Sequence, residues 1–368
     1  YFIYQMAGTR DGNFKELVSP FLKGKLEKIR NQFGEHSEQF NAIARQYLYD
    51  KSEEIIVDEE RGRHYQSELN VIFKNRFLKG VERLYKKTVL LEPSTVCAAH
   101  CRWCLRGQYP IKTMKYEDID LATEYLGSEN IRDDVNEVLI TGGDPLMTLP
   151  LLKYTISSII KNSSNIRIIR IGTRVPFQDP FRINDKMLDL FSSYKQLKFE
   201  IGINVCHPIE FWEESIESIK RLQDVGVRMY NQNPLLKGVN DNIETLTELY
   251  SILRDLDIES HYLFHAIPMR GMSHHRTSLK KGLQLVNTIS SSGEFSGRSK
   301  PKFSVLSDIG KIVIYQDSIV QRDKNYLLLK SGFNFNNRIK WNPTWKKPSS
   351  VQVNENGEML TWYLDGND

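Results

Sequence analysis

Residues 94–108 read STVCAAHCRWCLRGQ, and they place three of the chain's four cysteines within eight positions. The spacing is Cys97-x3-Cys101-x2-Cys104, and the loop directly follows the apolar run KTVLLE (87–92). A short run of this kind predicts a buried strand. The three thiols therefore stand at the carboxyl end of a strand, which is where α/β barrels carry their chemistry.

Five further apolar runs follow, and helix-like segments with apolar residues at three- and four-residue spacing separate them. These runs are NEVLIT (136–141), IRIIRIG (166–172), KFEIGIN (198–204), VRMYNQ (227–232) and SHYLFHA (260–266). Apolar strands that alternate with helices are typical of a parallel sheet covered by helices. No G-x-G-x-x-G turn follows the first strand, so six such units favour a partial (β/α)6 TIM-type barrel over a doubly wound sheet.

The composition and the spacing of apolar residues change on both sides of these units. Residues 1–85 are polar and charge-rich with helical spacing, and they predict a mainly helical N-terminal extension. After about residue 306 the pattern FSVLSDIGKIVIYQ predicts short antiparallel strands. The prediction is therefore an α/β protein with an extension at 1–85, a barrel at 86–305 and a small α+β or β appendage at 306–368.

Composition narrows the class of protein. Of the 368 residues, 40% are hydrophobic and 26% are charged, which is ordinary for a globular protein with a sizeable core. The net charge is only +4, so a nucleic-acid partner is not implied. No apolar run reaches about 18 residues, so no membrane span is expected. Four cysteines in so long a chain do not make a disulfide framework, and a reducing cytoplasm is expected.

The cysteine loop has three competing interpretations. The first is a structural role, but three clustered thiols seldom have one. The second is a zinc site, but zinc usually takes four ligands and the chain has no second cysteine pair to complete the set. His100 could join the thiols, but four ligands in one tight loop are awkward. An iron–sulfur cluster held by three thiolates would leave one iron open to a further ligand. Cys206 stands alone in NVCHP and is interpreted as a buried small residue.

A second motif lies at the next strand end. VLITGGDPL (138–146) closes its strand with Gly142, Gly143 and Asp144. Glycines let the backbone approach a ligand closely, and a carboxylate can accept from an ammonium group. Together with the C-x3-C-x2-C loop, this turn resembles the paired motifs of radical S-adenosylmethionine enzymes, in which the turn receives the amino group of the cosubstrate.

Further motifs occur in order across residues 88–303. They are VLLEPSTVCAAHCRWCLR, VLITGGDPL, IRIIRIGTRVPFQDPFRI, NVCHPIE, NQNPLLKGVND, HHRTSLKKG and SGRSKPKF. Together they resemble the lysine 2,3-aminomutase family of radical S-adenosylmethionine enzymes. The resemblance implies a [4Fe–4S] cluster on Cys97, Cys101 and Cys104, S-adenosylmethionine as cosubstrate, and a reductant such as flavodoxin or ferredoxin. It also implies a small-molecule substrate with a carboxylate, from which a radical takes a hydrogen atom.

The resemblance assigns further residues one at a time. Arg106 would clamp the substrate carboxylate, for which a guanidinium is well suited. The residues expected to bind the cofactors are Trp103, Gly142, Gly143, Asp144, Arg174, Asn204, His207 and Gln232. The polar loop MRGMSHHRT adds Arg270, His274 and His275 as candidates for the substrate pocket. Structural alternatives to these roles stay open. His207 could be a buried core histidine, and Trp103 could simply cover the cluster. The loop MRGMSHHRT could be an ordinary solvent-exposed loop.

The sequence also departs from the family pattern. Lys311 falls at the position of the lysine that holds pyridoxal phosphate, but Leu84 and Thr88 replace the cations that would hold its phosphate, with Tyr85 kept. Ile267 and Leu306 replace the two acids that would recognise a lysine side chain. We therefore expect an aminomutase that does not act on lysine, with a pyridoxal-independent radical enzyme as the alternative. Whether pyridoxal phosphate binds stays open, as does the oligomeric state.

Overall fold

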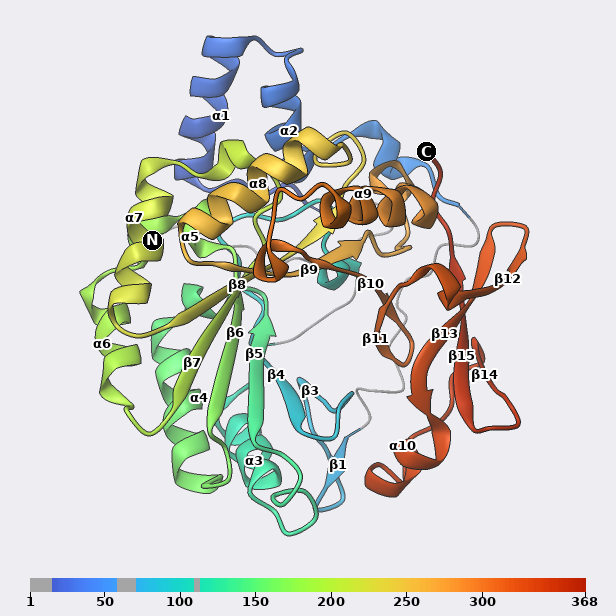
Figure 1. Ribbon diagram of the computed structural model, residues 1–368. Helices are drawn as coiled ribbons and strands as arrows, with labels where there is room; N and C mark the ends of the chain where they lie inside the picture. Colours follow the sequence, from blue (N-terminus) through green and yellow to red (C-terminus); the bar gives the residue numbers. More distant parts are fainter. Residues whose placement is uncertain (1–14, 58–70, 109–112) are drawn as a thin grey trace.

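The computed structural model describes residues 15–57, 71–108 and 113–368, and a curved sheet lies at its centre (Figure 1). Among these residues the sheet has nine strands in the order β11-β10-β9-β8-β7-β6-β5-β4-β3. The strands are β3 (Val81–Glu82), β4 (Thr88–Ser94), β5 (Glu137–Gly142), β6 (Ile168–Thr173), β7 (Lys198–Ile203), β8 (Arg228–Leu235), β9 (Glu259–His265), β10 (Lys302–Ser307) and β11 (Gly310–Val313). Strands β4 to β10 run parallel, whereas the two edge strands pair antiparallel. The predicted α/β partial barrel is confirmed, with β10 as an additional parallel strand.

Helices cover the outer face of this sheet (Figure 1). They are α3 (Tyr116–Leu126), α4 (Leu149–Asn162), α5 (Val175–Gln178), α6 (Asp185–Ser193), α7 (Glu213–Asp224), α8 (Ile243–Asp255) and α9 (Leu279–Ser291). Side chains alternate along each strand, so Val138 and Ile140 of β5 are completely buried in the main core. Leu139 and Thr141 of the same strand point to the concave side and line a cavity. The concave face of the sheet is therefore the place for a site.

The described part of the N-terminal extension begins with two helices, α1 (Pro20–Phe33) and α2 (Glu38–Tyr47), and the short 3₁₀ turn η1 (Lys51–Glu54). Ser19 and Ser37 cap the helices by accepting from backbone N–H groups of their first turns. The apolar faces form a separate core cluster, and Ala99 of the cysteine loop is part of it. Strands β1 (Ile72–Phe73) and β2 (Arg76–Phe77) make a hairpin, so the predicted extension is not wholly helical.

The C-terminal segment forms its own four-stranded antiparallel sheet in the order β12-β13-β15-β14. Its elements are β12 (Ile319–Asp323), β13 (Tyr326–Asn334), α10 (Phe335–Trp341), β14 (Val351–Val353) and β15 (Glu358–Leu364). The predicted antiparallel strands are thus present, but β10 and β11 belong to the central sheet. The boundary expected at 305/306 falls inside β10, and the division into three segments stays a prediction.

Short 3₁₀ turns lie in the connections between these strands and helices. They are η2 (Leu105–Gln108), η3 (Pro145–Met147), η4 (Pro180–Arg182), η5 (Pro208–Glu210), η6 (Ser273–His275), η7 (Gly297–Ser299) and η8 (Gln316–Ser318).

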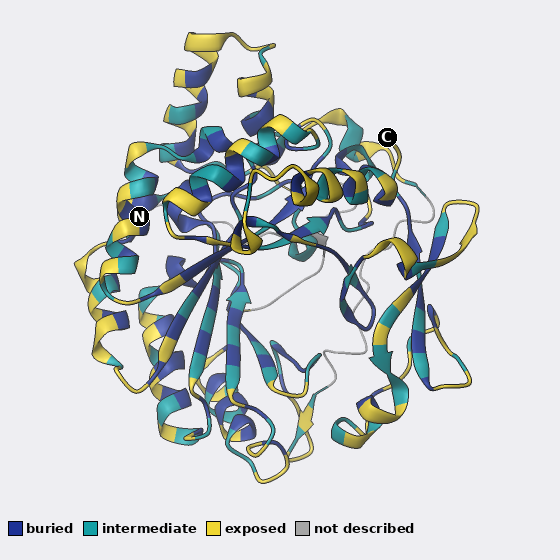
Figure 2. Ribbon diagram, in the orientation of Figure 1, coloured by how far each residue is buried: buried dark blue, intermediate teal, exposed yellow. Residues whose placement is uncertain are grey.

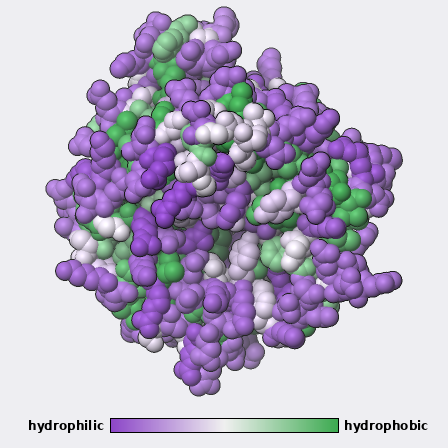
Figure 3. Space-filling model, viewed as in Figure 1, coloured by the Kyte–Doolittle hydropathy of each residue, from purple (hydrophilic) through white to green (hydrophobic). Residues whose placement is uncertain are grey.

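Buried residues gather along the strands and on the inner sides of the helices, and exposed residues lie on the outer turns of the helices and in loops (Figure 2). Most of the face seen in Figure 3 is hydrophilic, with apolar side chains in scattered patches. Within the described ranges, no helix has the length and apolarity needed to span a bilayer.

Candidate active site

A cavity of about 360 Å³ lies on the concave side of the sheet and brings together the cysteine loop and Lys311. Most of the predicted site residues line it. They are Cys97, Cys101, Trp103, Cys104, Arg106, Gly142, Gly143, Asp144, Arg174, Asn204, Gln232, His275 and Lys311. Residues far apart in the sequence meet here because the carboxyl ends of parallel strands share one edge. The lining does not include His207, Arg270 or His274.

The cysteine loop is held from the side of the N-terminal extension. The backbone N–H of His100 donates to the carbonyl of Leu17 at 2.8 Å, and that of Arg102 donates to the carbonyl of Gln46 at 2.9 Å. The fully buried Arg102 side chain forms an ion pair with Glu53 of η1. The backbone between the outer two cysteines is thus fixed by residues that precede the barrel.

The glycine pair after β5 allows the cysteine loop to approach the next strand. A Cβ on Gly142 would lie 2.5 Å from the carbonyl oxygen of Ser94, and one on Gly143 would lie 2.5 Å from the carbonyl carbon of Thr95. Gly142 also has a φ of 113°, which side chains rarely adopt. The close approach that these glycines permit is therefore to the loop that carries Cys97.

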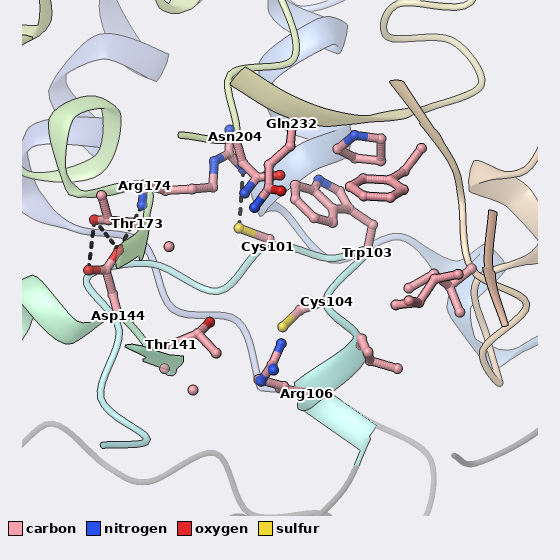
Figure 4. Close-up of a pocket in the computed structure, with 18 of the residues that line it drawn as sticks. Cys101, Trp103, Cys104, Arg106, Thr141, Asp144, Thr173, Arg174, Asn204 and Gln232 are labelled. Carbon is pink, nitrogen blue, oxygen red and sulfur yellow. Dashed lines mark hydrogen bonds between the residues drawn. The ribbon is translucent and has the colours of Figure 1, made fainter. Parts of the chain in front are cut away.

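Asp144 is occupied by donors from its own chain (Figure 4). Its carboxylate accepts from the Thr173 hydroxyl at 2.8 Å, the Arg174 N–H at 2.7 Å and the Leu146 N–H at 3.0 Å. Burial raises the pKa of this carboxyl, and these hydrogen bonds act in the opposite direction. These hydrogen bonds show that Asp144 joins the ends of β5 and β6, and its predicted contact with an ammonium group stays a prediction.

We expect Asp144→Ala to lower the free energy of unfolding by about 1–3 kcal/mol for each buried donor that it leaves without an acceptor. Denaturant unfolding of the variant measures this loss. Asp144→Asn is the matched control, because it keeps the shape and one acceptor oxygen, and its loss should be smaller. Wild-type stability in the Ala variant would contradict the joining role.

Arg174 and Cys101 make a direct contact. The Arg174 Nη1 donates to Cys101 Sγ at 3.1 Å, and Gln178 Nε2 donates to the same sulfur at 3.4 Å. On its other side, Arg174 pairs with the fully buried Glu210. The sequence reasoning found Arg174 and Cys101 but missed the ion pair with Glu210, because Glu210 lies on a separate element 36 positions away.

Arg106 lies beside the cavity and is already ion-paired. Its Nε donates to an oxygen of Glu92, a buried carboxylate on β4. Glu92 precedes the cysteine loop in the sequence, and the motif LLEP offers the only signal that could have pointed to it. If Arg106 binds the substrate carboxylate, Glu92 would hold one edge of the Arg106 guanidinium in place while it does so.

Lys311 lines the cavity, and its side chain lies over two aromatic rings. Its Nζ lies 5.4 Å from the ring centre of Tyr262 and 5.3 Å from that of Phe264, within range of cation–π attraction. Burial, with Arg170 nearby, lowers the pKa of Lys311 to about 8. The backbone N–H of Lys311 donates to the Tyr85 hydroxyl at 3.0 Å, which fixes the strand under it.

Arg170 of β6 also lines the cavity, and the sequence reasoning did not single it out. Its guanidinium donates to Glu137 at 2.8 Å and to the Tyr230 hydroxyl at 2.8 and 3.0 Å. The alternation of IRIIRIG places Arg170 on the face opposite to Ile169 and Ile171, which was the available signal.

The predicted histidines have different surroundings. His207 Nδ1 accepts from the backbone of Ile209 at 3.1 Å, and burial lowers the pKa of His207 to about 4. This arrangement supports its interpretation as a structural histidine. His275 is buried against the cavity, and its ring stacks 3.9 Å from His274. Arg270 is exposed.

Several polar atoms at the cavity have no partner within the part of the chain described. They are Trp103 Nε1, Gln232 Oε1 and both ring nitrogens of His275. Buried polar groups are normally hydrogen-bonded, so these atoms mark places where a bound molecule would supply the missing hydrogen-bond partners.

The donor set at the loop fits a multi-iron cluster better than a single ion. Three thiols line one cavity, and two side-chain donors point at Cys101. Over the described ranges, no three Cys, His, Asp or Glu side chains lie close enough to hold one metal ion. Three thiolates from one loop match the ligand count of an iron–sulfur cluster with one iron left open, whereas a structural zinc site takes four ligands.

Comparison with known proteins agrees with this geometry. The family model of the Radical SAM superfamily matches residues 91–250. The chain is 33% identical over 263 residues to a putative L-lysine 2,3-aminomutase of Aquifex aeolicus (strain VF5). The matched residues are 69% of this chain and 68% of that protein. A second Aquifex aeolicus protein of the same name is 28% identical over 318 residues, 83% of each chain. The L-lysine 2,3-aminomutase of Methanococcus maripaludis is 30% identical over 257 residues, 68% of this chain and 58% of that enzyme.

The protein is thus a radical S-adenosylmethionine enzyme, a class that uses a [4Fe–4S] cluster and S-adenosylmethionine with a reductant. Within this class, the chain belongs to the lysine 2,3-aminomutase family, as a divergent member.

Proposed function

We propose that this enzyme catalyses an aminomutase-like radical reaction on a carboxylate-bearing small molecule other than lysine. The observation that carries the proposal is the single cavity shared by the cysteine loop and Lys311. When bound, the cluster and S-adenosylmethionine supply a radical that removes a hydrogen atom from the substrate. Cys97, Cys101 and Cys104 would hold the cluster, and flavodoxin or ferredoxin in a reducing cytoplasm would serve as the electron donor.

The chain's own residues would position the substrate between these two ends. Arg106, held by Glu92, offers a cation for the substrate carboxylate beside the cluster loop. Ile267 and Leu306 add apolar surface to the lining of the cavity. Trp103, Gln232 and His275 add polar atoms that have no partner among the described residues. The cavity walls would exclude water from a radical, which protects it from side reactions.

Lys311 fits one half of the requirements for pyridoxal phosphate. An amine with a pKa of about 8 is roughly a tenth neutral at pH 7, whereas an ordinary lysine is almost wholly charged. A neutral amine is the form that attacks an aldehyde. The low pKa of Lys311 is therefore what imine formation needs.

The phosphate half of the requirement is less well met. Leu84 is apolar, and the Thr88 hydroxyl donates to Glu137. The guanidinium of Arg170 is shared between Glu137 and Tyr230. This observation favours the second candidate, a radical enzyme that works without pyridoxal phosphate and performs an epimerisation, an elimination or a modification of a larger substrate.

Reaction with pyridoxal phosphate separates the two candidates. If Lys311 binds this cofactor, borohydride should trap an adduct on the Lys311 peptide, detected by mass spectrometry. Its yield should rise with pH through about 8, because the amine loses its proton there. Lys311→Met should abolish the adduct, and Lys302→Met on neighbouring β10 should not. No adduct on this peptide at any pH would favour the pyridoxal-independent reaction.

A further inference from the structure

The sulfur of Cys101 receives hydrogen bonds from two side chains, one directly after β6 and one at the end of α5. Arg174 directly follows β6, and its Nη1 donates to Cys101 Sγ at 3.1 Å (Figure 4). Gln178, one helical turn later, donates to the same sulfur at 3.4 Å. Arg174 is only 6% exposed, so its charge lies away from bulk water. A thiolate at this position would have a buried cation as its neighbour.

The guanidinium of Arg174 is fixed from its far side. Nη2 donates to Glu210 Oε2 at 2.6 Å and to Gln46 Oε1 at 2.9 Å. The rings of Tyr47 and Trp103 lie 5.0 and 5.4 Å from its central carbon. Anion and amide hold one edge of the planar group, and the other edge therefore has to face Cys101.

Glu210 is in turn held by the backbone around it. Its Oε1 accepts from the N–H groups of Cys206 and His207 at 2.9 and 3.0 Å, and from Gln46 Nε2 at 3.2 Å. With 0% exposure, Glu210 cannot swing toward solvent. The strand end of β7 and helix α2 thus fix the orientation of Arg174 together.

We propose that this network sets the reduction potential of the cluster, with Glu210 and Gln46 as positioning residues for Arg174. The inference rests on the proposed cluster site at the three cysteines. Reduction adds one electron from a one-electron donor, so it makes the cluster and its thiolates more negative. A buried cation and hydrogen bonds to a ligand sulfur stabilise that more negative state, and protein surroundings weaken the attraction less than water does. Glu210 offsets part of the charge, but it lies on the edge of the guanidinium away from the sulfur.

The test is a redox titration of the full-length, reconstituted protein, followed by electron paramagnetic resonance of the reduced cluster without S-adenosylmethionine. Arg174→Met keeps most of the volume and removes the charge and the donor. At a fixed solution potential, its ratio of reduced to oxidised cluster should fall at least tenfold, which is 59 mV for a one-electron couple. Arg170→Met is the matched control, because Arg170 lies on β6 just before Arg174 and lines the same cavity, but its guanidinium contacts Glu137 and Tyr230 and no cysteine. Its ratio should stay close to that of the wild type.

Two milder variants guard against loss of the cluster in Arg174→Met. Arg174→Lys keeps the charge without the planar fork, and Gln178→Leu removes the second donor to Cys101 without changing any charge. Both should shift the ratio in the same direction by less than Arg174→Met. Iron and sulfide counts accompany each titration. Full iron content with an unchanged midpoint in all three variants would overturn the inference, whereas a wild-type chain that holds no cluster would overturn the proposed function itself.

Discussion

Changing Cys97, Cys101 or Cys104 to Ala is expected to remove essentially all iron and all cleavage of S-adenosylmethionine, whereas Cys206→Ala is expected to retain both. The reason is the position of the thiols. The first three line the cavity, whereas Cys206 is fully buried in a small apolar cluster with Leu236, Val239 and Ala266. A cluster held by three thiolates has no spare ligand, so each loss is decisive.

Anaerobic reconstitution followed by iron and sulfide counting measures the first effect, and chromatography of 5′-deoxyadenosine measures the second. Cys206→Ala is the control for handling and folding, since it also removes one sulfur. If that variant lost its iron while a loop variant kept it, the assignment of the cysteine loop would be wrong.

L-lysine is expected to give no useful turnover to β-lysine, with or without pyridoxal phosphate. Ile267 and Leu306 both line the cavity, so a lysine ammonium directed at them would meet no counter-charge. Leaving an ammonium group buried and unpaired costs several kcal/mol. A substrate with an apolar or neutral end loses nothing comparable at that wall.

The assay is anaerobic incubation of the reduced enzyme with S-adenosylmethionine and L-lysine, with chromatographic detection of β-lysine. A matched variant, Leu306→Asp, restores an acid at one of the two positions and should raise binding of lysine if the pocket is the one described. Repeated turnover to β-lysine by the unmodified enzyme would contradict the prediction and would direct attention to Glu82, an acidic residue in the lining.

The parts of the fold that the sequence predicts are those with a local cause. The run KTVLLE predicts β4 because an apolar, β-branched stretch suits a strand that is buried on both faces. The run FSVLS was expected to form a short antiparallel strand, but it belongs to β10 of the central sheet, and the boundary expected at 305/306 falls inside this strand. A strand that pairs in parallel with β9 and antiparallel with β11 carries no local mark of the change.

The same distinction separates the site residues. The thiols are predictable because their spacing is itself the signal. Glu210 and Gln46 were not found, since each acts through Arg174 from 36 and 128 positions away in the chain. Asp144 was found for its motif, but its partners on β6 are set by tertiary packing that spacing does not reveal.

The anchoring of the cysteine loop by α2 has a consequence for the order in which the chain is made. Gln46 leaves the ribosome before the cysteines, but Glu210 follows Cys104 by 106 residues (210 − 104). At about 5–20 residues per second, roughly 5–20 s separate the three thiols from the anion that anchors Arg174. A nascent chain in that interval has the three cysteines but not the buried charge pair beside them. Assembly of the complete surroundings of Cys101 is therefore a late event in synthesis, and a chain cut to residues 91–250 would never complete them, because it lacks Gln46.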